Sequence, residues 1–174
     1  MINYCAFRFF EKISCLFNSN GNLINSSIDG FIKFKNYLKN KPEIKLSLSD
    51  EITIGKTSSY SSGIQIDDCN FHQCVNPRDF MSQKVLLISP PDGEFIAMNY
   101  RITTDFAAPF KIYTYTEESP YKLEIKVKIQ ANFTDKFSAS NVVLRFNVPK
   151  TTQNVYFDIQ GKKIGQKAEY SNNE

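Results

Sequence analysis

The sequence has no tryptophan, one histidine and seven glycines among its 174 residues. The single histidine, His72, restricts any Ser-His-Asp or Cys-His catalytic site to one position, because these sites need an imidazole base. No run of about 18 or more apolar residues occurs, so no helix is predicted to span a bilayer. The segment Gly161 to Lys163 lacks the flanking residues of a phosphate-binding loop. These absences predict a non-enzymatic protein with no catalytic residues and no cofactor.

The cysteines are the next candidates for chemistry, and two of the four, Cys69 and Cys74, flank His72. A thiolate–imidazole pair or a metal cluster is one reading of this arrangement. Zinc sites use three or four ligands, commonly with Cys-x2-Cys spacing, whereas the spacing here is Cys-x4-Cys. On a strand, Cys69 and His72 would also point to opposite faces. We therefore favour buried cysteines and a packed histidine, and we predict no metal.

Charge is nearly balanced, with a net charge of +3 and a pI of about 8.6, and it gives no indication of nucleic-acid binding. Anionic cytosolic leaflets attract lysine clusters by about 1 kcal/mol per residue. The cluster Lys162, Lys163 and Lys167 is accordingly a candidate lipid-binding site, and a solvated surface is the alternative. The first ten residues show no signal-peptide pattern, which predicts a cytosolic protein with reduced thiols.

Short strands dominate the predicted secondary structure. Apolar and polar residues alternate through Leu123 to Gln130, which predicts a strand with one buried face and one wet face. Val85 to Ile88 is continuously apolar and is predicted to be a strand buried on both faces. Strands are also expected at 44–48, 111–116, 142–148 and 155–159.

Turn residues separate these strands. Asn18 to Gly21 tolerate left-handed φ and predict a hairpin, which favours a strand over a helix for the aromatic-rich residues 5–17. Pro90 to Gly93 predict a sharp reversal between two strands. Many short strands joined by turns indicate an all-β fold, an antiparallel β-sandwich. The pattern is interrupted at Asp105 to Pro109, which predicts a boundary there.

Several segments, in this order and spacing, resemble the mu homology domain, the cargo-reading part of the medium subunit of adaptor-protein complexes. They are Ser27–Gly30, Lys35–Leu38, Lys41–Leu46, Asp67–Val75, Pro90–Phe95 and Met98–Arg101. Within the family, Ile54–Lys56, Asn99–Arg101 and Pro109–Ile112 are most similar to the branch of the fourth adaptor complex. The resemblance implies a cargo-recognition subunit in vesicle-mediated transport.

The family fold has two all-β subdomains, the second inserted into the first. The resemblance implies that residues 1–105 form the first part of the outer subdomain and that residues 106–174 begin the inserted one. It further implies that the fold is incomplete at the C-terminus and that the N-terminal longin-like domain is missing. Both losses lead us to expect impaired cargo binding.

The family reads Tyr-x-x-bulky-apolar signals as an added β-strand. The lysine of its tyrosine pocket matches Lys35, the aromatic position falls on Ala6, and the acidic position falls on Arg8. Because a guanidinium accepts no hydrogen bond, weak or absent binding of tyrosine signals is expected. A second pocket, known in the fourth-complex branch, has its aromatic residue at Phe71, while its charged residues are replaced by Met81 and Asn99.

Lys35 and Phe71 are therefore the predicted cargo-binding residues. The resemblance implies as partners the large and small adaptor subunits and the cytosolic tails of membrane cargo, with anionic phospholipid as a further candidate. It implies a peripheral location on trans-Golgi, endosomal or coated-vesicle membranes. The competing hypothesis is a stand-alone lipid-binding β-module that uses the lysines at 162, 163 and 167.

Overall fold

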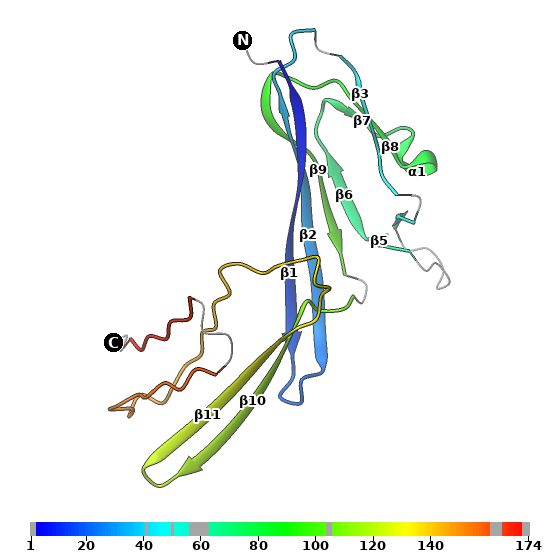
Figure 1. Ribbon diagram of the computed structural model, residues 1–174. Helices are drawn as coiled ribbons and strands as arrows, with labels where there is room; N and C mark the ends of the chain where they lie inside the picture. The colour runs from blue at the N-terminus through cyan, green and yellow to red at the C-terminus, as the bar shows by residue number, and fades with distance from the viewer. Residues whose placement is uncertain are drawn as a thin grey trace. The chain divides into compact units, whose positions relative to one another are not determined.

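The computed structural model describes residues 3–40, 42–49, 51–55, 63–103, 106–160 and 165–171. Its contacts divide the chain into two compact units, Met1–Phe133 and Thr134–Glu174. The strands and the helix found in these described ranges all belong to the first unit (Figure 1). No helix among the described residues is long and apolar enough to cross a membrane. The mostly antiparallel β-structure confirms the predicted fold class.

The larger sheet has four strands in the order β1-β2-β9-β6, and neighbouring strands are antiparallel. Its strands are β1 (Cys5–Phe17), β2 (Leu23–Asn36), β9 (Gly93–Ile102) and β6 (Asp68–Phe71). The predicted hairpin joins β1 to β2. Its turn is held by the Asn18 side-chain oxygen, which accepts from the backbone N–H groups of Asn20 and Asn22 at 3.0 and 2.8 Å. Gly21 supplies the left-handed φ of +79° that the turn requires.

The smaller sheet has three antiparallel strands in the order β3-β8-β7. Its strands are β3 (Ile44–Ser47), β8 (Val85–Ile88) and β7 (Val75–Asn76). A short parallel pair, β4 (Thr53–Ile54) and β5 (Gln65–Ile66), departs from the antiparallel prediction. One helical turn, α1 (Phe80–Gln83), was not predicted from the sequence. The predicted reversal at residues 90–93 lies between β8 and the start of β9, so it joins strands of different sheets.

Side chains from both sheets and from α1 form one apolar core. Alternation along β2 buries Ile32 and Phe34 on the core face and leaves Lys33 and Lys35 on the outer face. The rest of the core comes from the neighbouring strand β9 and from β3, β5, β7, β8 and α1, namely Leu46, Ile66, Val75, Phe80, Leu86, Ile88, Phe95, Ala97, Met98 and Ile102. In β8 the buried positions alternate with half-buried ones. The prediction of a strand buried on both faces was therefore wrong for one face, which is only half-buried.

Tyr100 links three strands of the larger sheet. Gly30 pairs with Tyr100 on one side and with Glu11 on the other. A Cβ atom at Gly30 would lie 2.2 Å from the tyrosine ring, so only glycine lets the ring lie across β2. The Tyr100 hydroxyl donates a hydrogen bond of 2.6 Å to Glu11 on β1. Burial, together with this bond, raises the pKa of Tyr100.

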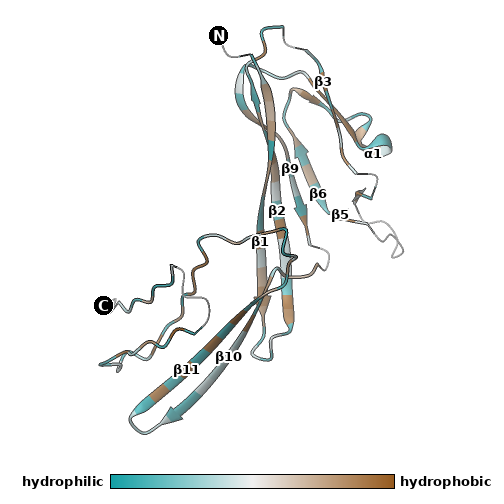
Figure 2. Cartoon of the chain, in the orientation of Figure 1, coloured by the Kyte–Doolittle hydropathy of each residue, from teal (hydrophilic) through white to brown (hydrophobic). Residues whose placement is uncertain are grey.

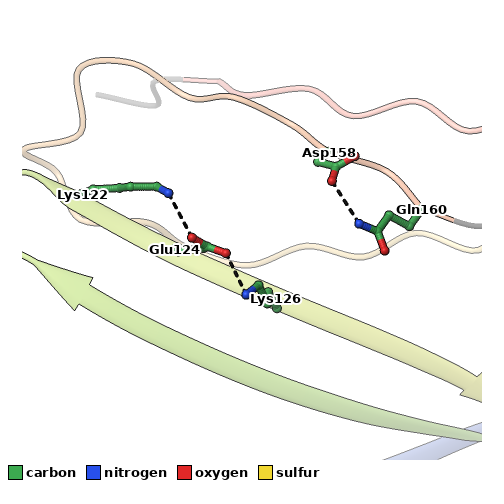
Figure 3. A network of polar contacts seen from close by, with 5 residues as sticks. All are labelled: Lys122, Glu124, Lys126, Asp158 and Gln160. Atoms are coloured by element: carbon green, nitrogen blue, oxygen red, sulfur yellow. Dashed lines mark hydrogen bonds and ion pairs between the residues drawn. The ribbon is translucent and has the colours of Figure 1, made fainter.

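The hairpin of β10 (Phe110–Ser119) and β11 (Lys122–Ala131) confirms both strands predicted there. Figure 2 shows apolar and polar residues alternating along β11. No residue of either strand is buried, because no second sheet covers them within the described ranges, so the predicted buried face of β11 was wrong. On the surface, Glu124 pairs with Lys122 at 3.0 Å and with Lys126 at 2.9 Å (Figure 3).

The second compact unit has turns and irregular backbone in its described residues, 134–160 and 165–171. The strands predicted at 142–148 and 155–159 are absent there. A strand needs a neighbour to satisfy its backbone hydrogen bonds, and these segments pair with no other described residue. Most of their apolar side chains are exposed instead. The predicted subdomain boundary near residue 105 remains a prediction.

Candidate functional site: a cationic cleft on β1 and β2

A cleft of about 230 Å³ lies on the outer face of the first two strands. It is lined by Tyr4, Ala6, Arg8 and Phe10 around β1 and by Lys33 and Lys35 of β2. The lining residues alternate along each strand because every second side chain points to the same face. The small side chain of Ala6 leaves space between its larger neighbours.

The register of the hairpin brings together the three positions that the family resemblance assigned to a tyrosine pocket. Ala6 pairs directly with Lys35, and Arg8 pairs directly with Lys33. Lys35, Ala6 and Arg8 therefore line one cleft, and these are the three positions that the resemblance assigned to the tyrosine pocket. A cargo-binding role for Lys35 itself remains a prediction.

Glu94 on β9 compensates part of the positive charge of the cleft. Its carboxylate forms an ion pair with Lys33 at 2.6 Å and a second ion pair with Lys35. Hydrogen bonds from Lys33 and Lys35 lower the pKa of Glu94 to about 2. The hydrogen bond with Glu94 in turn raises the pKa of Lys35. Glu94 thus holds both ammonium groups on the outer face of the sheet.

The depressed pKa of Glu94 makes a pH-dependent contribution to stability. In the unfolded chain a glutamate titrates near about 4.3. The contribution is therefore fully present above that pH and is lost as the pH falls towards about 2. We expect Glu94→Gln to lower the denaturation midpoint slightly near neutral pH, because the ion pairs are at the surface. The difference from wild type should disappear in acid, and a constant difference over this range would contradict the assignment.

Phe71 lies at the end of β6 on the core side of the sheet, opposite Met98. Its ring packs edge-on against Phe80, with 5.2 Å between the ring centroids. This packing explains why an aromatic residue occupies position 71 even if it binds no ligand. The predicted role of Phe71 in cargo binding remains a prediction. Met81, which takes the place of a charged residue of that second pocket, is exposed on α1.

Of the three lysines predicted to bind lipid, Lys162 and Lys163 lie outside the described residues. Lys167 is described, and its ammonium group forms an ion pair with Glu169. Both side chains of this pair are largely exposed. The lipid-binding prediction is therefore neither supported nor contradicted by the structure.

His72 and Cys74, which the sequence singled out, are in contact. The His72 Nδ1 atom lies 3.1 Å from the Cys74 sulfur and accepts the Cys74 backbone N–H at 3.2 Å. The His72 ring also packs beside Phe95, with 5.3 Å between centroids. Burial raises the pKa of the Cys74 thiol, which disfavours the reactive thiolate. Among the described residues no group of three or more His, Cys, Asp or Glu could hold a metal.

Sequence reasoning missed part of the cleft. The sequence did not single out Lys33, Tyr4, Phe10 or Glu94 as site residues. A signal was available, because Tyr4, Ala6, Arg8 and Phe10 occupy alternate positions before a strong hairpin turn. The turn alone would not have given the partner of Arg8, because a β-bulge between Leu16 and Phe17 shifts the register by one residue and brings Arg8 opposite Lys33.

The fold and the cleft together define a mostly antiparallel β domain with a cationic cleft on the outer face of its larger sheet. Residues 3–174 match the model of the adaptor complexes medium subunit family. The chain belongs to this family of non-enzymatic subunits, which confirms the resemblance to a mu homology domain.

Individual relatives agree with this assignment. The chain is 38% identical to the AP-4 complex subunit mu of Arabidopsis thaliana over 169 residues, which cover 92% of the chain and 38% of that protein. It is 33% identical to the AP-2 complex subunit mu of Caenorhabditis elegans over 168 residues, or 91% of the chain and 38% of that protein. The chain thus spans well under half the length of these relatives.

Solved structures show the same fold at low sequence identity. The yeast delta-COP-I mu-homology domain matches with a TM-score of 0.54 and 13% identity, over 73% of this chain and 50% of that one. The same yeast domain complexed with a Dsl1 WxWxV peptide matches with a TM-score of 0.52 and 15% identity, over 72% of this chain and 49% of that one.

Proposed function

We propose that this chain is the cargo-recognition part of an adaptor-complex medium subunit and binds extended peptides from the cytosolic tails of membrane proteins. The observation that carries the proposal is the convergence of Ala6, Arg8 and Lys35 in one cleft. The cleft adjoins β1, which lies at the edge of its sheet in the described part of the chain. An edge strand offers unpaired backbone groups to an extended peptide, and the cleft offers a place for one side chain.

The composition of the cleft predicts how it treats a tyrosine. The stem of Lys35 can pack against a phenol ring. Arg8 and Lys35 are both donors only, so neither can accept the hydrogen bond of the tyrosine hydroxyl. Peptides of the Tyr-x-x-bulky-apolar type are therefore expected to bind weakly.

The proposed partners follow from the same assignment. They are the large and small adaptor subunits and membrane cargo, with anionic phospholipid as a further candidate. The proposed location is peripheral on trans-Golgi network, endosomal or coated-vesicle membranes. The relatives whose names include AP-4 and AP-2 support an adaptor complex as the setting.

The proposal is tested by restoring an acceptor to the cleft. We expect the 174-residue chain to bind a Tyr-x-x-bulky-apolar peptide with a Kd weaker than micromolar. The double variant Ala6→Phe, Arg8→Asp should bind the same peptide about tenfold or more tightly, because a carboxylate accepts the phenol proton. Isothermal titration calorimetry measures both affinities.

Lys12→Asp is the matched control, because Lys12 lies on the outer face of β1 but outside the cleft. It makes the chain similarly more acidic and should leave affinity within about twofold, since an exposed charge outside the binding site contributes little. Micromolar binding by the unaltered chain would contradict the expected weakness. An absence of any gain in the double variant would place peptide binding elsewhere.

A further inference from the structure

The cleft has more positive charge than the fold requires. Arg8 pairs directly across the strands with Lys33, and like charges in this position are destabilising. Glu94 already neutralises part of the charge of Lys33 and Lys35. Arg8 forms no ion pair with any residue in the described part of the chain. No neighbouring carboxylate forms an ion pair with this guanidinium. An anionic ligand could therefore form one.

Elsewhere on the same face of the sheet, a row of four charged residues is electrically balanced, unlike the cleft. Across the four strands, Lys12, Asp29, Arg101 and Asp68 are aligned by the register in alternating sign. Arg101 lies 3.7 Å from Asp29. Charge on this face of the sheet is therefore balanced four residues beyond Arg8 along β1, and the excess positive charge lies in the cleft around Arg8.

The shape of the cleft limits the ligand to one side chain with an aromatic part. Its volume of about 230 Å³ is below the roughly 300–1,000 Å³ of sites that hold a drug-sized molecule. Tyr4 and Phe10 stand on either side of Ala6 and Arg8 along the strand. Because Tyr4 and Phe10 are about 20 Å apart along an extended strand, a ring over Ala6 would lie beside Tyr4 alone. Arg8, on the other side of Ala6, favours a negative group at the end of that ring.

We propose that the cleft binds a phosphorylated tyrosine side chain in an extended peptide. The aryl ring packs over Ala6 beside Tyr4, with Arg8 on its other side. The phosphate, with a charge of about −1.5 to −2, accepts paired hydrogen bonds from the guanidinium of Arg8 and a further bond from Lys33 or Lys35. This inference rests on the proposed peptide-binding function and specifies the side chain that the cleft prefers.

The test compares three peptides of identical sequence that contain tyrosine, phosphotyrosine or glutamate at one position. Fluorescence polarisation with the full 174-residue chain measures each affinity at low and at moderate salt. Because charge-assisted hydrogen bonds to phosphate are strong, the phosphotyrosine peptide should bind about tenfold or more tightly than the tyrosine peptide. It should also bind more tightly than the glutamate peptide, which has no ring to pack over Ala6 beside Tyr4.

The outcomes separate this inference from the proposed function. Equal or tighter binding of the unphosphorylated peptide overturns the inference and leaves peptide binding in place. If no peptide binds, both are overturned. Tighter binding of the glutamate peptide would replace phosphotyrosine by a general acidic ligand and would also overturn the inference.

Substitutions locate the phosphate. Arg8→Gln should weaken phosphotyrosine binding about tenfold and change binding of the tyrosine peptide by less than about twofold. Glu94→Gln removes the competing carboxylate and should strengthen phosphotyrosine binding. Lys12→Gln removes one charge from the same face of β1 outside the cleft and should have less than about a twofold effect. Equal losses from Arg8→Gln and Lys12→Gln would indicate general electrostatic attraction and contradict the proposed site.

Vesicles provide the comparison with a lipid headgroup. Vesicles of phosphatidylcholine with phosphatidylserine or a phosphoinositide are sedimented with wild-type and Arg8→Gln protein. We expect sedimentation, where it occurs, to be independent of Arg8 and unaffected by the phosphotyrosine peptide. Sedimentation that depends on Arg8, without competition by the peptide, would assign the cleft to lipid and overturn the inference.

Discussion

Replacing Phe34 by alanine is expected to lower the free energy of unfolding by about 3–5 kcal/mol. Phe34 is fully buried at the centre of the core. Its ring stacks on Phe95 at 5.5 Å and on Phe7 at 5.7 Å between centroids. Truncation removes these contacts and leaves a cavity that both sheets would have to close. Equilibrium denaturation in urea, followed by circular dichroism, measures the loss.

Phe7→Ala is the matched control for this prediction. Phe7 pairs with Phe34 across the hairpin and loses the same atoms on substitution, but it is 48% exposed. Because much of its ring is already in water, we expect a loss below about 2 kcal/mol. If the two substitutions had equal effects, Phe34 could not be at the centre of the core.

The second large effect is expected at Asn36, the polar residue at the end of β2 that is fully buried. Its side-chain nitrogen donates to the carbonyl oxygens of Pro90 and Pro91 at 3.4 and 3.1 Å, and its oxygen accepts the N–H of Leu38 at 3.2 Å. These bonds join the end of β2 to the segment between β8 and β9. Asn36→Asp replaces the donor by a buried charge facing two carbonyl oxygens, which should cost about 3–5 kcal/mol at neutral pH.

The effect of Asn36→Asp should depend on pH in a defined direction. Burial favours the neutral carboxyl and raises its pKa in the folded state. Below the unfolded value of about 3.9 both states are protonated, so the destabilisation is smallest in acid and grows as the pH rises. Unfolding measured near pH 4 and near pH 7 tests this. The same change at the exposed Asn70 should alter stability by less than about 0.5 kcal/mol, and a similar loss there would contradict the argument.

Local patterns predicted the strands well where the pattern and the partner lie close in sequence. The alternation in 123–130 and the turn at 18–21 identified β11 and the β1–β2 hairpin. The same kind of pattern failed at 142–148, where apolar residues find no strand to pair with among the described residues. Alternation reports that a segment is able to form a strand, but hydrogen-bonding partners decide whether it does.

Short and non-local elements were not predictable in this way. The helical turn α1 has four residues, which is too short for a helical period to appear. It ends at Lys84, whose left-handed φ of 57° no sequence pattern indicated. The parallel pairing of β4 with β5 depends on how the chain returns after an intervening segment, and local composition does not encode that return.

The candidate site was predicted in part. Matching to the family identified Lys35 and showed that Ala6 and Arg8 replace the aromatic and acidic positions. The compensating role of Glu94 and the opposition of Arg8 to Lys33 required the register of three strands. Phe71 was proposed from the same matching, but its ring packs against Phe80, a contact made by a helix that was not foreseen.

The hydrogen bond from Tyr100 to Glu11 has a consequence for how the edge of the larger sheet moves. β1 cannot separate from β2 at its midpoint without also losing its connection to β9. Fraying therefore proceeds from the ends of β1 and stops at Glu11. Tyr4 to Phe10 lie on one side of this anchor, so the half of β1 that lines the cleft can adjust its backbone to an incoming chain while Glu11 stays in place.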